Sequence, residues 1–108
     1  MFYRYEESEA AEPFPGVRRR MLSCGDRVQI IEFFLPKGAE FPSHSHPHEQ
    51  TGFISSGRLW VRIGGEEREL GPGDGYSVPP NVEHSTRAPE DCVNIDVFSP
   101  PREEYRDR

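Results

Sequence analysis

The sequence lacks the features of several common protein classes. No apolar run approaches the roughly 20 residues needed to cross a membrane, and the amino terminus lacks the basic-then-apolar order of a signal peptide. Basic residues are in deficit as well, because 13 Lys and Arg face 19 Asp and Glu, for a formal net charge of −6. An acidic surface repels nucleic acid and anionic lipid. We therefore expect a cytoplasmic protein with neither nucleic acid nor membrane as a partner.

Cysteine is scarce, since only Cys24 and Cys92 are present. Two cysteines are too few for a disulfide-stapled scaffold. Neither belongs to a C-x-x-C pair, so we assign neither to a metal and expect free thiols, although a fold that brought them together could pair them. The one basic cluster, Arg18-Arg19-Arg20, alternates between the faces of an extended segment. We interpret it as solvated charge at a sheet edge rather than as a contact to DNA.

Long stretches free of glycine and proline, which helices need, are nearly missing, because 10 Gly and 11 Pro interrupt the 108 residues. Apolar and β-branched residues instead form short runs bounded by turns, and Gly64-Gly65 between two such runs is a hairpin signal. We predict an all-β domain of about eight short strands, arranged as a sandwich or barrel. The predicted strands cover 17–22, 28–35, 51–55, 58–63, 66–70, 75–78, 84–88 and 93–98.

The length allows one domain. We assign the acidic residues 1–15 to an N-terminal arm, residues 16–105 to the domain and residues 106–108 to a polar C-terminal tail. Alternation along the strand at 58–63 places Trp60 on its wet face, where a large aromatic residue is unusual. A flanking strand could cover Trp60; alternatively, Trp60 is a dimer contact.

Histidine is concentrated in one place, since His44, His46 and His48 lie within five positions and only His84 lies elsewhere. Imidazole is the most common side-chain ligand of transition metals. Alternate side chains of an extended segment share a face, so His44 and His46 could bridge one ion, and His48 has the same parity. The cluster predicts a metal site.

Two spaced patterns contain these histidines: Gly38-x5-His44-x-His46-x3-Gln50-x6-Gly57 and Gly73-x5-Pro79-x4-His84. They resemble the two cupin motifs, G-x5-H-x-H-x3,4-E-x6-G and G-x5-P-x-G-x2-H-x3-N. This resemblance implies a jelly-roll β-barrel, the double-stranded β-helix of cupins, with one divalent transition metal ion inside it. The implied ligands are His44, His46, Gln50 and His84, whereas the cupin spacing argues against His48.

Three positions depart from these motifs, because Gln50 replaces the usual glutamate, Asn81 a glycine and Ala88 the final asparagine. Asparagine tolerates left-handed backbone geometry, and Ala88 has little bearing on the metal. With the neutral Gln50, three imidazoles and an amide leave the charge of the ion uncompensated, which favours a Lewis acid that binds an anionic substrate. Zinc, nickel, manganese, iron and copper all stay open. Alternatively, Gln50 is a structural amide that bonds a loop.

A closer similarity links the chain to the KdgF-like cupins of pectin degradation, and it is carried by residues 44–50, 78–84 and 96–105. That resemblance implies conversion of unsaturated monouronates into linear keto acids, with Asp96, Phe98 and Arg102 lining the pocket. Asp96 could act as a general acid/base or pair with an interior arginine. Arg102 could clamp a substrate carboxylate or be a solvated charge. Phe98 is expected to be pocket wall or core.

We therefore expect a metal-dependent enzyme that acts on a small anionic carbohydrate. One alternative is a dioxygenase with redox-active iron, copper or manganese, which Gln50 disfavours because such iron sites use two histidines and a carboxylate. Another is a non-enzymatic cupin that binds or senses a ligand. The edge strands of a small jelly roll need cover. We expect a homodimer in which the N-terminal arm and Trp60 are candidate contacts.

Overall fold

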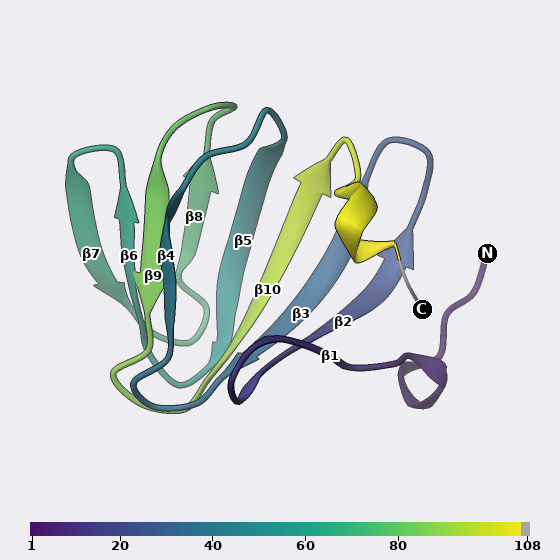
Figure 1. Ribbon diagram of the computed structural model, residues 1–108, viewed down its shortest axis with the longest axis horizontal. Coiled ribbons are helices and arrows are strands. Elements are labelled where there is room, and N and C mark those ends of the chain that lie inside the picture. Colours follow the sequence, from purple (N-terminus) through teal and green to yellow (C-terminus); the bar gives the residue numbers. More distant parts are fainter. Residues whose placement is uncertain (107–108) are drawn as a thin grey trace.

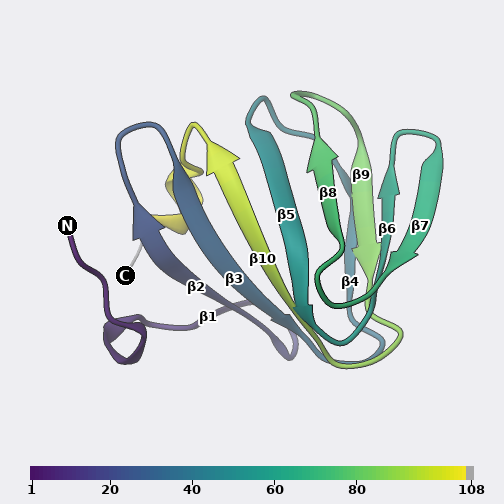
Figure 2. The ribbon, with the colours of Figure 1, turned by 180° about the vertical axis from the view of Figure 1, so that it is seen from behind.

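Two antiparallel β-sheets face each other in the computed structural model, which describes residues 1–106 (Figure 1). The larger sheet, seen from behind in Figure 2, has six strands in the order β1 (Ala11–Phe14), β2 (Val17–Cys24), β3 (Gln29–Leu35), β10 (Cys92–Ser99), β5 (Glu49–Ser56) and β8 (Gly75–Val78). The smaller sheet has the order β4 (Glu40–His44), β9 (His84–Arg87), β6 (Leu59–Ile63) and β7 (Glu66–Leu70).

This arrangement is the all-β jelly roll that the sequence predicts, with ten strands in place of about eight. The strands that the sequence did not reveal are β1, inside the segment assigned to the arm, and β4, whose proline and polar residues hide the usual strand signal. Among the described residues, helix is limited to two three-residue 3-10 turns, η1 (Tyr5–Glu7) and η2 (Glu103–Tyr105). Within residues 1–106, no helix is long and apolar enough to cross a membrane.

The core lies between the sheets and is built from strict alternation on the central strands. Every second residue of β3 and of β10 is buried, as expected of strands with one face in the core. Three of these inward positions hold polar side chains, at Gln29, Asn94 and Asp96, each no more than 4% exposed. Buried polar groups are costly without hydrogen-bond partners. These three residues therefore indicate the part of the interior where a polar site replaces apolar packing.

Two residues with positive φ shape the turns, and one of them joins the two histidine-bearing segments. Gly57 has φ +78°, and a Cβ there would lie 2.9 Å from the Cα of Cys92, so only glycine fits this turn. Asn81 has φ 66°, which confirms the left-handed geometry expected of it. The main-chain N–H of Asn81 donates to the carbonyl of His46 at 2.8 Å, and this bond ties the second motif to the first.

Tyr5 and Ser8, which precede β1, lie against the outer face of the six-stranded sheet. Tyr5 donates its hydroxyl to Glu32 at 2.7 Å, and the guanidinium of Arg20 lies over the Tyr5 ring and donates to Ser8. On the inner face, Arg19 lies over the ring of Tyr105 at 4.7 Å. The expectation of solvated edge charge is therefore wrong for Arg19 and Arg20, which are half-buried. The prediction took the strand alternation into account but not the chain segments that cover each face.

Trp60 lies on the outer face of the four-stranded sheet and is half-buried. Its cross-strand partner on β9 is Arg87, whose guanidinium lies over the indole ring at 5.9 Å. This contact fits the first interpretation of Trp60, an aromatic residue covered by its neighbouring strand. Of the C-terminal tail at 106–108, residues 107 and 108 lie outside the described part of the chain.

Candidate functional site

Three of the four histidines converge between the two sheets. His44 ends β4 and pairs in register with His84, which begins β9, while His46 follows in the loop before β5. The ring centroids are 4.2 Å apart for His44 and His84 and 4.8 Å apart for His46 and His84. One ring nitrogen from each of the three lies within 4.8 Å of the others, so the group could hold a metal ion.

The hydrogen bonds of the three rings leave one nitrogen of each ring directed to a common centre. Each Nδ1 lies 2.9–3.1 Å from a main-chain carbonyl oxygen, from Pro42 for His44, from His48 for His46 and from Val82 for His84. A carbonyl fixes the proton on Nδ1 and leaves Nε2 as the electron-pair donor. The Nε2 of His84 is buried and has no hydrogen-bond partner, which is the state expected of a metal ligand.

Electrostatics keep two of these rings, those of His46 and His84, neutral. Burial, together with the charge of Arg102 and the proximity of His84, lowers the pKa of His46 to about 4. Burial also lowers the pKa of His84 below its ordinary value. A metal-binding imidazole must be unprotonated, and both rings already satisfy this condition at neutral pH.

Gln50 links the histidines to a buried carboxylate. Its Oε1 lies 3.1 Å from Nε2 of His46, while its amide group hydrogen-bonds the side chains of Asp96 and Tyr76. With the His46 proton on Nδ1, two electron-pair donors face each other at this point, and a cation between them removes the conflict. The residues present thus fit a transition metal.

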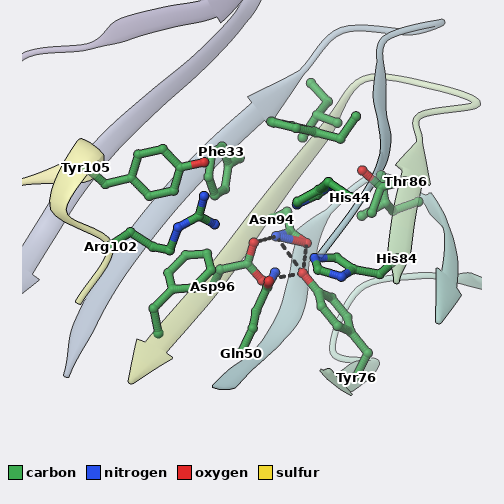
Figure 3. Close-up of a pocket in the computed structure, with 14 residues that line it drawn as sticks. Phe33, His44, Gln50, Tyr76, His84, Thr86, Asn94, Asp96, Arg102 and Tyr105 are labelled. Atoms are coloured by element: carbon green, nitrogen blue, oxygen red, sulfur yellow. Dashed lines mark hydrogen bonds between the residues drawn. The ribbon is translucent and has the colours of Figure 1, made fainter. Parts of the chain in front are cut away.

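Asp96 is held by a network of uncharged donors (Figure 3). Asn94 donates to its Oδ2 at 2.9 Å, and the hydroxyl of Tyr76 donates to its Oδ1. Burial raises the pKa of Asp96 to about 6, against the opposing effect of these hydrogen bonds. Burial and the nearby carboxylate raise the pKa of Tyr76 well above its ordinary value, so the phenol keeps its proton and acts as the donor.

Glycine at position 52 allows Asp96 and Tyr76 to meet. In register, Gly52 on β5 lies between Asp96 on β10 and Tyr76 on β8. Strands two apart are roughly 9–10 Å apart, so their side chains meet only when the strand between them presents none. A Cβ at Gly52 would lie 2.6 Å from the carbonyl oxygen of Ile95 and 3.0 Å from the Tyr76 hydroxyl, and it would overlap the Asp96 carboxylate.

The C-terminal segment supplies Arg102 in a fixed position. The fully buried amide of Gln29 accepts from the main-chain N–H of Arg102 at 2.9 Å and donates to its carbonyl at 3.3 Å. The guanidinium lies over the rings of Phe98 and Tyr105 and pairs with Glu104 at 2.8 Å. The side chain is only 11% exposed, so Arg102 is a held charge and not a solvated one.

The other residues that the sequence singled out are also placed. His48 stays outside the three-histidine group and supports it through its carbonyl. Phe98 is 2% exposed, and its ring centroid lies 5.9 Å from that of His46, which makes it a wall of the site.

One pocket connects these groups. It is lined by His44, Gln50, Tyr76, His84, Asn94, Asp96, Phe98, Arg102, Tyr105 and five further residues. The interpretation of the sequence missed Tyr76, Asn94, Gly52 and Gln29. Alternation from Asp96 could have identified Asn94, and a glycine inside a strand is a known sign of close approach. No local signal connects Tyr76 or Gln29 to the site, because their partners are 20 and 73 residues away.

Comparison with known proteins gives the family of this chain. Residues 31–98 match the cupin domain family. The pectin degradation protein KdgF of Dickeya dadantii (strain 3937) is 31% identical over 102 residues, which is 93% of each chain. The structure of KdgF from Halomonas sp. superposes with a TM-score of 0.91 at 30% identity over 96% of each chain. An RmlC-like cupin from Shewanella frigidimarina NCIMB 400 has a TM-score of 0.92 at 33% identity, covering 96% of this chain and 94% of its own. The chain belongs to the cupin family.

Proposed function

We propose that this cupin is a metal-dependent isomerase that converts an unsaturated monouronate into the linear keto acid. The observation that carries the proposal is one pocket lined by two members of the three-histidine group, His44 and His84, by the buried carboxylate of Asp96 and by the fixed cation of Arg102. The similarity to proteins named KdgF, one of them a pectin degradation protein, supports this choice of substrate class.

Recognition of the acid falls to Arg102. Its guanidinium is nearly buried against aromatic rings, and a guanidinium matches a carboxylate in a bidentate geometry. Phe98 provides the apolar wall beside it. A metal ion held by His44, His46 and His84, with Gln50 beside them, would supply Lewis acidity toward sugar oxygens.

Asp96 is the proposed general acid/base. The reaction is an isomerisation: the proton of the hydroxyl on carbon 1 leaves, the bond from that carbon to the ring oxygen breaks, and carbon 4 of the resulting enol gains a proton as the ketone forms. One carboxylate can accept the first proton and deliver the second, so no co-reactant is needed. Tyr76, Asn94 and Gln50 hold this carboxylate in place through hydrogen bonds.

The test is a turnover assay with unsaturated galacturonate, followed by loss of its conjugated ultraviolet absorbance. We expect metal-dependent acceleration over the spontaneous rate, and a decrease of about 10²–10⁴-fold in Asp96→Asn. Asp26→Asn, at an exposed turn between β2 and β3, is the matched control and should keep full activity. Absence of acceleration with any of zinc, nickel, manganese, iron or copper would refute the proposal, and oxygen uptake would point to dioxygenase chemistry instead.

We also propose that the protein is a homodimer through the outer face of its six-stranded sheet. That face presents a contiguous row of half-buried or exposed apolar side chains: Ile30, Phe34, Phe53, Val93, Ile95 and Val97. Arg18 and Glu32 lie on the same face and carry opposite charges, so two copies related by a twofold axis can pair them. Aromatic and aliphatic residues next to such charges are typical of self-complementary interfaces.

Molecular mass in solution tests this interface. Phe53, which is 45% exposed, is the residue to change, and Phe53→Glu should yield a monomer. Arg62→Glu, on the exposed outer face that carries Trp60, should leave the dimer intact. If Arg62→Glu dissociates the protein and Phe53→Glu does not, the interface lies on the Trp60 face, and a monomeric native protein would exclude both.

A further inference from the structure

The guanidinium of Arg102 already has a carboxylate bound to it. Oε2 of Glu104 lies 2.8 Å from Nη2 of Arg102, and this ion pair lowers the pKa of Glu104. The side chain of Glu104 is 58% exposed, whereas that of Arg102 is 11% exposed. The partner of the arginine is therefore an exposed surface group that reaches inward, and it is not part of the packed wall.

The contact leaves the guanidinium only partly used. Nε of Arg102 is buried and has no hydrogen-bond partner, although a guanidinium has five N–H donors. A carboxylate that binds the edge of the group adjoining Nε needs Nε and Nη2 together. An incoming carboxylate would thus share Nη2 with Glu104, and two like charges at one nitrogen repel each other.

Glu104 is not needed to hold Arg102 in position. The buried amide of Gln29 bonds both main-chain groups of Arg102, at 2.9 and 3.3 Å. The guanidinium also lies 5.4 Å from the ring centroid of Phe98 and 4.8 Å from that of Tyr105. These contacts hold both the main chain and the guanidinium of Arg102. Removal of the Glu104 charge should therefore leave Arg102 in place.

We propose that Glu104 is an internal competitor for the substrate carboxylate, so that an acid binds Arg102 by displacing it. This inference rests on the proposed function for the identity of the acid, a monouronate. Glu104 then sets the affinity and the selectivity of the site: a ligand must bring a negative charge to replace the one it displaces. A neutral sugar of the same shape cannot replace the Glu104 carboxylate at Arg102, so removal of Glu104 does not raise its affinity.

The chain provides a matched control in the preceding residue. Glu103 lies in the same 3-10 turn, is exposed and pairs with Arg106 at 3.0 Å, away from Arg102. Glu103→Gln changes the net charge by the same amount as Glu104→Gln. Any difference between the two variants therefore reports on the contact to Arg102 and not on the overall charge of the protein.

The experiment is a titration of ¹⁵N-labelled protein with galacturonate, a saturated acid that is not turned over, and with its methyl ester. Glu104→Gln should bind galacturonate roughly two- to fivefold more tightly than the native protein, the effect of one partly exposed ion pair, with no change for the ester. Glu103→Gln should bind both ligands as the native protein does. The side-chain amide signal of Gln29 should stay in place in Glu104→Gln, which shows that Arg102 has not moved.

Two results would overturn the inference. If Glu104→Gln binds galacturonate with equal or lower affinity while the Gln29 signal stays in place, Glu104 does not compete. If the Gln29 signal shifts and binding weakens, Glu104 positions the arginine. Because the titration needs no turnover, a protein that fails to isomerise unsaturated galacturonate can still pass this test, and the two proposals fail independently.

Discussion

Replacement of Gly52 by alanine tests the central feature of the site, the meeting of Asp96 and Tyr76 above a residue without a side chain. Glycine inside a strand is normally unfavourable by about 0.5–1 kcal/mol relative to alanine. In the absence of steric conflict, Gly52→Ala should therefore stabilise the protein. The structure predicts the opposite sign, because the added methyl group would meet atoms on both neighbouring strands.

The magnitude follows from which atoms would have to move. The new Cβ would lie 2.6 Å from the main-chain oxygen of Ile95, well inside a normal contact, and a backbone oxygen in a paired strand cannot rotate away. Overpacking of this kind costs about 1–3 kcal/mol, which corresponds to a decrease in Tm of roughly 4 °C or more for a domain of this size. The methyl group would also displace the Asp96 carboxylate, so kcat should decrease by about 10²-fold or more.

Thermal unfolding and the uronate assay measure these two effects. Gly65→Ala is the matched control, because it changes the same atoms in the β6–β7 turn, where nothing lies within 4 Å of the added group. We expect its unfolding free energy to match that of the native protein to within about 0.5 kcal/mol, and its activity to be unchanged. A Gly52→Ala protein that is as stable and as active as the native one would refute the proposed role of this glycine.

Three other predictions concern single groups. Tyr76→Phe removes the hydroxyl that donates to Asp96, so kcat should decrease while unfolding free energy falls by only about 0.5–1.5 kcal/mol; an unchanged kcat would show that this bond does not orient the carboxylate. Excess zinc or nickel should raise the Tm of chelator-treated protein, because a free metal concentration of 100 times the dissociation constant adds about 2.7 kcal/mol to the free energy of unfolding. His84→Ala should abolish this increase in Tm; an increase that persists would place the metal elsewhere. Burial raises the pKa of Cys92 to about 11, so at pH 8 only about one thiol in a thousand is ionised; iodoacetamide should modify the half-buried Cys24 alone in the folded protein, as read by peptide mass spectrometry, and rapid modification of Cys92 would contradict its burial.

Much of the three-histidine group that could hold a metal was predictable from the sequence because its spacing is a local feature. His44 and His46 are two residues apart in an extended segment, and the spacing of the glycines around them specifies the turns. His84 is a distant residue, but a recognisable pattern led to it. The prediction was weaker for Arg102, for which a solvated charge was also open, since nothing in the tail itself shows that its backbone is bound by a buried side chain.

The basic cluster at 18–20 shows the limit of reasoning from alternation alone. Alternation correctly assigns Arg19 to one face and Arg20 to the other. It does not reveal that η2 covers the first and the N-terminal residues cover the second. Exposure depends on which segments pack over a strand, and those segments come from opposite ends of the chain.

The sequence by itself determined the all-β class, the turns and the group of side chains that can hold a metal. These properties follow from composition, from period-two alternation and from short spacings, which are local. Only the tertiary structure decided that Asp96 meets Tyr76 across Gly52, that Gln29 fixes Arg102 and that Glu104 occupies the guanidinium. The contacts of Asp96 with Tyr76 and of Gln29 with Arg102 join residues that are far apart in the chain. The ion pair of Glu104 depends on the fixed position of Arg102, which Gln29 provides.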